Sequence, residues 1–350
     1  MFYLATIFSY YIFLGLTLLL TGAAINNAAR QASAGILFIL FPVVMFALIN
    51  FSKEKSEKIK QKLESLKTQH FTKSDLYTIV FATLGMVLTF ILNNELGLGP
   101  VEGSAIVGIL GAVILPKYQV PIYAGSFAGM ATTTAFPNYY GVVLAGVLTG
   151  LLLAGSKHIL TGFGGKLGAS GLFGTITASL LAGNFIFEKT PVMLNVRFFP
   201  LLYFMIAVNV TYYINKINKV GVVLASAIVG LIASILLPVM HGQQLGLTYA
   251  GAAFAGAFIG MSSIERLERE EYLLLASILG AFVYEFTMIN FVGLGGRMGT
   301  TAFVSIMATL GFIEFFNLTK HNRKKYRIQV QTEEGTRDNM NYAMEQKLTQ

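Results

Sequence analysis

The sequence predicts an all-α polytopic membrane protein, and composition is the first observation behind this fold class. Only 12% of the 350 residues are charged, 55% are hydrophobic, and the mean hydropathy is +0.65. A soluble protein of this size would carry about 25% charged residues. Many apolar runs are about 18 residues long, which is close to the length a helix needs to cross a bilayer. The composition therefore excludes an ordinary soluble domain.

The second observation is an internal duplication. Gly99–Pro116 recurs as Gly221–Pro238 with nine identities in 18 positions, at an offset of 122 residues. Beyond an insertion around 241–251 the offset is 131 residues, and two more blocks recur: Tyr123–Thr132 as Phe254–Ser263, and Gly162–Gly168 as Gly293–Gly299. We call two residues equivalent when the duplication aligns them. A duplicated membrane unit with glycine-rich interruptions at matching places is typical of transporters.

The chain is expected to begin with an N-terminal helix pair, residues 1–51. Its helices are predicted at about 3–22 and 34–51, with a polar turn at 26–33 between them. No positive charge precedes the first apolar run, which is also longer than the apolar region of a usual signal peptide. We therefore interpret the first run as an uncleaved transmembrane helix.

A basic segment, residues 52–74, follows the helix pair. It carries seven lysines: Lys53, Lys55, Lys58, Lys60, Lys62, Lys67 and Lys73. Ile59, Leu63 and Leu66 form one apolar stripe at helical spacing. Two interpretations remain open, a solvated linker helix and an amphipathic cytoplasmic helix that binds anionic lipid. The segment ends in a capping-box pattern at 72–75, which predicts the start of the next helix.

Two membrane repeats are expected next, repeat one over 75–190 and repeat two over 191–319. Each contains five apolar segments, at 76–93, 101–116, 120–135, 140–156 and 169–187, and at 198–214, 221–238, 247–263, 272–291 and 300–318. Together with the N-terminal pair they give about twelve membrane segments. The basic tail, 320–350, is polar and without periodicity, and we expect it to be disordered.

The positions of lysine and arginine predict the topology. If each repeat crosses the membrane five times, six loop cations fall on the cytoplasmic side, as the positive-inside rule requires: Lys117, Lys157, Lys216, Lys219, Arg266 and Arg269. With four crossings each, three of them would face outward. Five crossings are therefore favoured, and an odd number makes the two repeats inverted. We expect a multi-pass protein of the cell (plasma) membrane with both termini in the cytoplasm.

The glycine motifs at 162–168 and 293–299 are the first candidate for a solute site. Each precedes the last helix of its repeat, where glycine-rich backbone exposes amide groups that favour anions. The expected substrate-binding residues here are two equivalent cations and four glycines: Lys166, Arg297, Gly164, Gly165, Gly295 and Gly296. The alternative is that the cations are interfacial anchors and that the glycines serve tight packing.

A second pair of motifs lies in the third segment of each repeat. Gly125 and Gly129 recur as Gly256 and Gly260, with the four-residue spacing of close helix contacts. Nearby hydroxyl groups can bind a polar solute or satisfy a broken backbone. We assign three of them to the substrate site: Ser126, Thr132 and Ser262. A packing seam and a solute-lining broken helix both fit the pattern, and the short third segments are expected to be kinked.

Glu285 is the candidate for ion coupling, because a carboxyl group inside an apolar segment is costly and functional by default. Its equivalent is Ala154, so the feature is asymmetric, and structural pairing with a cation is the alternative. The chain has no cysteine and only four scattered histidines. No metal-ligand spacing or catalytic motif results. We expect no metal, no cofactor, no catalytic residues and no enzymatic activity.

These observations favour a secondary transporter or permease for a small polar solute, with an anion favoured over a cation, bound between the inverted repeats. Two alternatives remain open. One is a passive solute channel of the same inverted-repeat type, and the other is a membrane subunit or sensor of a larger complex. The expected partners are the solute and the lipid bilayer, with a homo-oligomer or partner subunit left open. On a membrane protein, the net charge of +8 indicates which loops are cytoplasmic, so no nucleic-acid partner is expected.

Overall fold

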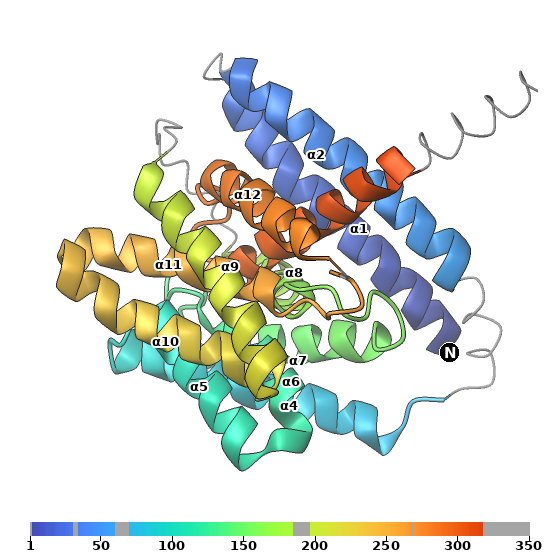
Figure 1. Ribbon diagram of the computed structural model, residues 1–350. Helices are drawn as coiled ribbons and strands as arrows, with labels where there is room; N and C mark the ends of the chain where they lie inside the picture. Colours follow the sequence, from blue (N-terminus) through green and yellow to red (C-terminus); the bar gives the residue numbers. More distant parts are fainter. Residues whose placement is uncertain (1, 31–33, 60–69, 185–196, 268, 318–350) are drawn as a thin grey trace, which may run out of the picture.

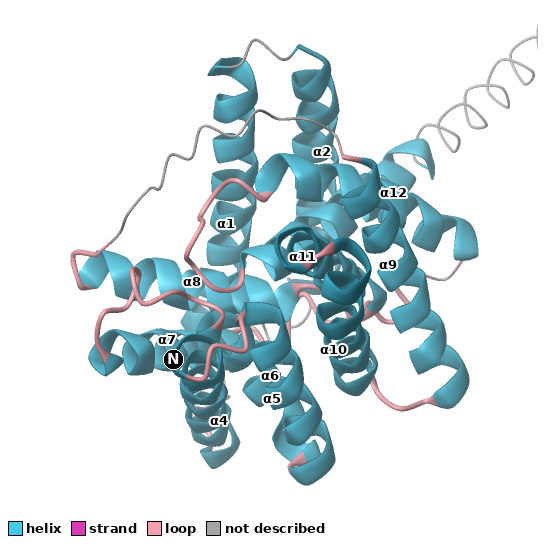
Figure 2. Ribbon diagram, turned by 90° about the vertical axis from the view of Figure 1, so that its left-hand side faces the viewer, coloured by secondary structure: helices cyan, strands magenta, loops and turns pink. Residues whose placement is uncertain are grey.

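The computed structural model describes residues 2–30, 34–59, 70–184, 197–267 and 269–317, and every regular element within these ranges is a helix (Figure 1, Figure 2). Six of these helices are long and apolar enough to cross a membrane, and two shorter apolar ones accompany them. The helical membrane class predicted from composition is confirmed at this level. The centre of the basic segment and the tail lie outside the described residues, as does the anionic-lipid hypothesis for that segment.

The N-terminal pair consists of α1 (Phe2–Arg30) and α2 (Ala34–Lys53), which run side by side (Figure 1). A short π-helix, η1 (Glu54–Ile59), continues α2. The prediction that the first helix ends near residue 22 is wrong. The helix continues through the polar stretch because Asn27 donates a 2.6 Å hydrogen bond to Asn290 Oδ1 of repeat two, a partner that local sequence does not reveal.

Repeat one contains five helices. They are α4 (Lys73–Phe90, continued by the π-helix η2, Ile91–Glu95), α5 (Pro100–Ile114), α6 (Gln119–Gly129), α7 (Tyr139–Gly155) and α8 (Lys166–Leu181). The predicted capping box opens α4, with Thr72 N donating to Asp75 Oδ2 at 2.9 Å. As expected for a short third segment, α6 has few residues, but the same expectation is wrong for α11 (Gln243–Gly260), a continuous helix of 18 residues. The 11 residues of α6 span only about 16 Å, roughly half of a bilayer core.

Repeat two has the same order of helices. They are α9 (Phe198–Asn218), α10 (Val222–His241), α11 (Gln243–Gly260), α12 (Glu270–Thr287) and a last helix, Arg297–Asn317. The insertion around 241–251 is helical. It lengthens α10 and α11, where repeat one has the short 3-10 turn η3 (Pro116–Tyr118) between α5 and α6.

The two repeats share rare backbone conformations at equivalent positions. Left-handed φ angles recur in four equivalent pairs: Gly99 and Gly221 (89° and 92°), Leu160 and Phe291 (50° and 57°), Gly162 and Gly293 (77° and 84°), and Gly165 and Gly296 (81° and 88°). A positive φ is uncommon for a residue other than glycine. Its recurrence at Leu160 and Phe291 indicates that the loops before the last helix of each repeat follow the same path.

The predicted small-residue motifs are packing seams. In repeat one α6 lies against α4, and in repeat two α11 lies against α9. A Cβ atom on Gly129 would lie 2.6 Å from Thr89 Cβ, and one on Gly260 would lie 2.7 Å from Thr211 Cβ. Thr89 and Thr211 are themselves equivalent. A larger residue would therefore push the backbones apart at the same place in both repeats.

Candidate functional site

Two glycine-rich loops form the centre of the candidate site. We call residues 156–165 the Lys166 loop and residues 288–296 the Arg297 loop, after the cation that follows each. Each loop binds the other repeat just beyond the end of its third helix. Thr132 N donates to Gly293 O at 2.9 Å, and the equivalent Ser263 N donates to Gly162 O, also at 2.9 Å. The repeats therefore exchange equivalent hydrogen bonds.

The helices that follow the two loops touch at their first turns. A Cβ atom on Gly168 would lie 2.6 Å from Gly299 Cα, and one on Gly299 would lie 2.6 Å from Gly168 Cα. These glycines are equivalent, so the contact is reciprocal. Only a residue without a side chain allows this approach. The glycine motif therefore brings the start of α8 and the start of the last helix together between the repeats.

Both predicted cations hold the end of the preceding helix. Lys166 Nζ donates to Ser156 O at 2.6 Å and to Ile159 O at 2.7 Å. Arg297 donates to Met288 O. Carbonyl groups at a helix C-terminus lack intrahelical partners and carry the negative end of the helix dipole. Lys166 is buried, so its ammonium group does not reach a lipid headgroup, contrary to the interfacial-anchor alternative.

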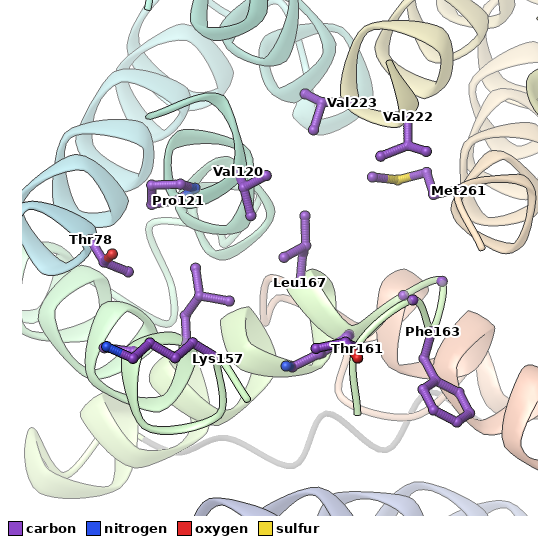
Figure 3. Close-up of a pocket in the computed structure, with 16 residues that line it drawn as sticks. Thr78, Val120, Pro121, Lys157, Thr161, Phe163, Leu167, Val222, Val223 and Met261 are labelled. Atoms are coloured by element: carbon purple, nitrogen blue, oxygen red, sulfur yellow. The ribbon is translucent and has the colours of Figure 1, made fainter. Parts of the chain in front are cut away.

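Two cavities adjoin these cations, and equivalent residues line them. The larger, of about 350 Å³, is lined by the Lys166 loop together with parts of both repeats. In Figure 3, Met261 of repeat two faces Thr161 and Leu167 of repeat one across it. The smaller, of about 170 Å³, is lined by the Arg297 loop. Its wall includes Met130, Gly293 and Arg297, which are the equivalents of Met261, Gly162 and Lys166 in the larger cavity.

The lining of both cavities is chemically similar. Apolar side chains and glycine backbone make up most of each wall, and each wall includes the cation at the start of the last helix. Lys157, Thr78 and Thr161 add polar groups to the larger cavity. No aspartate or glutamate is among the described residues that line either cavity. The walls therefore combine apolar surface with positive charge.

Four buried aromatic rings pack against one another beside the smaller cavity: Tyr123, Phe127, Phe254 and Phe258. They are two equivalent pairs, with ring centroids between 4.3 and 6.5 Å apart. Helix α6 runs from the larger cavity, which its Val120 lines, to the smaller, which its Phe127 lines. We call these four residues the ring cluster. Two of its rings, Phe127 and Phe258, line the smaller cavity.

Each repeat also joins the start of its first helix to the end of its fourth helix by an ion pair. In repeat one Lys157 Nζ lies 2.6 Å from Asp75 Oδ1, and in repeat two Arg197 Nε lies 3.2 Å from Glu285 Oε2. Asp75 and Arg197 are equivalent, so the charges are reversed between repeats. Glu285, the predicted coupling residue, therefore has a cationic partner. Sequence reasoning missed Asp75 and Arg197, although the offset of 122 residues aligns them.

The predicted substrate-binding residues divide into three groups. Gly164, Gly165 and Lys166 line the larger cavity, and Thr132, Gly296 and Arg297 line the smaller. The other three are buried at packing contacts and line neither cavity: Ser126, Ser262 and Gly295. Ser126 Oγ lies 2.9 Å from Ser104 Oγ, and Ser262 Oγ accepts from Gly164 N at 3.0 Å. The assignment of all nine to solute binding stays a prediction.

Comparison with protein-family models, with curated proteins and with solved structures finds no match to this chain.

Proposed function

We propose that this chain is a secondary transporter for a small polar solute, and that its repeats move the solute by alternating access. The observation that carries the proposal is the pair of cavities. Equivalent residues line them, their volumes differ, and the ring cluster lies between them. In transporters with inverted repeats the solute site lies at the repeat interface, and each repeat in turn adopts the arrangement of the other. In one state of such a cycle, the two cavities are lined by equivalent residues but differ in volume.

Helix α1 supports an inverted arrangement of the repeats. Near its start, Thr6 Oγ1 donates to Gly155 O at the end of α7. Near its end, Asn27 contacts Asn290, just beyond α12, the equivalent of α7. Thr6 and Asn27 are separated by about 30 Å along a helix, the thickness of a bilayer core. The ends of two equivalent helices therefore lie near opposite ends of α1, which supports an inverted arrangement of the two repeats.

The charge of the cavities favours an anionic solute. Arg297 forms no ion pair with a carboxylate of the described residues. These residues give its guanidinium group one hydrogen bond, to Met288 O, although the group has five N–H donors. An unpaired charge inside a membrane protein is costly. A bound anion would supply the missing charge, and the apolar walls would contact the rest of the solute.

Cysteine labelling tests the proposal without knowledge of the solute, because the chain has no cysteine of its own. The equivalent residues Met261 and Met130 line the larger and the smaller cavity, and each is replaced by cysteine in a separate variant. A membrane-impermeant maleimide is then added to one face of sealed vesicles at a time. We expect Met261→Cys to react from the cytoplasmic face and Met130→Cys from the opposite face.

A panel of small anions then tests alternation. An anion that is transported should lower the labelling rate at one cavity and raise it at the other. Reaction of both cysteines from the same face would overturn the inverted arrangement. Reaction of each cysteine from both faces would indicate a continuous pore, and therefore the passive channel.

A further inference from the structure

Arg266 contacts three residues at one side of the larger cavity. It lies in the non-helical stretch after α11. Its two terminal nitrogens bind both carboxylate oxygens of Glu54, one of them at 3.2 Å. Its Nε and Nη2 both donate to Thr161 O at 3.1 Å. The guanidinium carbon also lies 4.1 Å from the ring centroid of Phe163. Thr161 and Phe163 belong to the Lys166 loop and line the cavity.

This contact joins the N-terminal helix pair to the cavity wall. Glu54 begins η1, directly after α2, and lies outside both repeats. The Glu54 side chain is 4% exposed and the Arg266 side chain 13%. The position equivalent to Arg266 in repeat one is Ala135, which has no group that could form such a contact. The N-terminal pair therefore contacts both loops, but by different means: a buried ion pair holds the Lys166 loop, whereas one hydrogen bond, from Asn27 to Asn290 Oδ1, holds the Arg297 loop.

We propose that Arg266 is a positioning residue, through which the N-terminal helix pair stabilises the state in which the larger cavity is open. A closing movement of the Lys166 loop would separate Thr161 and Phe163 from Arg266. Contacts made in one state only shift the equilibrium towards that state. A bidentate guanidinium–carboxylate pair has a fixed geometry, so Glu54 orients the guanidinium group that binds Thr161 O and contacts the Phe163 ring. The inference rests on the proposed function, because it assumes that the two cavities alternate.

The experiment measures labelling rates at Met261→Cys and Met130→Cys in full-length protein in vesicles. Each reporter is combined in turn with Glu54→Gln, with Arg266→Ala and with Arg266→Lys. The matched control is Glu314→Gln. It breaks the ion pair of Lys53 with the last helix, a second contact between the N-terminal pair and the repeats that includes no cavity residue. A melting curve of each variant establishes that it is folded.

Loss of the Glu54–Arg266 contact should shift the population away from the described state. We expect the ratio of the Met261→Cys rate to the Met130→Cys rate to fall about tenfold in Glu54→Gln and Arg266→Ala, with one rate falling while the other rises. Arg266→Lys, which keeps the charge, should restore part of the ratio, and Glu314→Gln should leave it unchanged.

Two results would overturn the inference. The first is an unchanged ratio in Glu54→Gln and Arg266→Ala. The second is a rise of both rates together, which indicates general loosening of the fold. The proposed function fails separately, when neither a variant nor any solute changes the two rates in opposite directions.

Discussion

At the residue scale, the two predicted cations have the same structural task and different surroundings. Lys166 and Arg297 both bind carbonyl groups at the end of the preceding helix. Lys166 binds two carbonyls and is buried, whereas the described residues give Arg297 one hydrogen bond, to Met288 O. Equivalent positions can therefore contribute differently to stability and to solute binding.

The first prediction concerns Lys166. Lys166→Met removes the ammonium donor of Ser156 O and Ile159 O, at a cost of about 1–3 kcal/mol in all, because Ser156 O keeps its 3.1 Å hydrogen bond from Ile159 N. Lys166→Arg, which places in repeat one the residue found at the equivalent position, should keep most of the stability. Melting curves of the detergent-purified variants measure both. Equal melting temperatures for Lys166→Met and the parent would contradict this role.

The second prediction concerns Arg297. A solute that binds only the folded protein raises its melting temperature by mass action. We expect one class of small anion to raise the melting temperature of the parent and to have no effect on Arg297→Ala. Lys53→Ala, which removes a cation distant from both cavity linings, is the control and should keep the shift. A shift preserved in Arg297→Ala would rule out the anion contact.

The third prediction concerns Glu285. If this carboxylate carries the coupling ion, Glu285→Gln should abolish the dependence of solute binding on sodium or pH. The matched control is Asp75→Asn, which breaks the ion pair at the equivalent place in repeat one. Melting temperatures with solute, with and without sodium and at two pH values, give the comparison. The same response in both variants would assign Glu285 to structural pairing instead.

At the scale of elements, the decisive contact is the crossing of α8 with the last helix at Gly168 and Gly299. Helices this close are held by packing, which tolerates no added volume. The crossing fixes the two glycine loops against each other, and with them the two cations and the inner ends of both cavities.

The fourth prediction tests this crossing. Gly299→Ala would place a methyl group 2.6 Å from Gly168 Cα, so we expect a loss of about 1–3 kcal/mol from overpacking. Gly22→Ala in α1 is the control, because nothing lies within 4 Å of the added methyl group. It should be neutral or stabilise by up to about 1 kcal/mol, because alanine is the better helix former. Equal melting temperatures for the two variants would contradict the close crossing.

At the scale of the whole molecule, the proposed transport mechanism requires the ring cluster to separate the two cavities. Phe127 and Phe258 are fully buried and lie 4.5 Å apart, with one ring from each repeat. In that mechanism a solute crosses only when the repeats rearrange. Its rings come from α6 and α11, the third helix of each repeat.

The fifth prediction removes one ring. Phe258→Ala should join the cavities, so that Met130→Cys becomes reactive from both faces of the membrane. Phe286→Ala removes a ring that is equally buried but lies outside the cluster, and it should leave the sidedness unchanged. If Met130→Cys still reacts from one face of the membrane in Phe258→Ala, the ring cluster is not the barrier.

The sequence by itself determined the membrane class, the duplication and the positions of the two glycine-rich loops. Sparse charge and long apolar runs are properties of local segments, and each helix satisfies its own backbone, so both can be read without a partner. The glycine motifs contain Gly162 and Gly293. In the structure, the carbonyl oxygens of both residues accept hydrogen bonds from the other repeat. Lys166 and Arg297 were found in the same way.

Tertiary structure alone decided which of these residues face a cavity and which serve packing. Ser126 and Ser262 had the same motif as Thr132, yet only Thr132 lines a cavity. The length of α1, the reversed ion pairs and the contact of Arg266 with Glu54 depend on residues 82 to 263 positions apart. Such contacts follow from how helices pack, and a hydropathy pattern, which repeats within a few turns, carries no information about them.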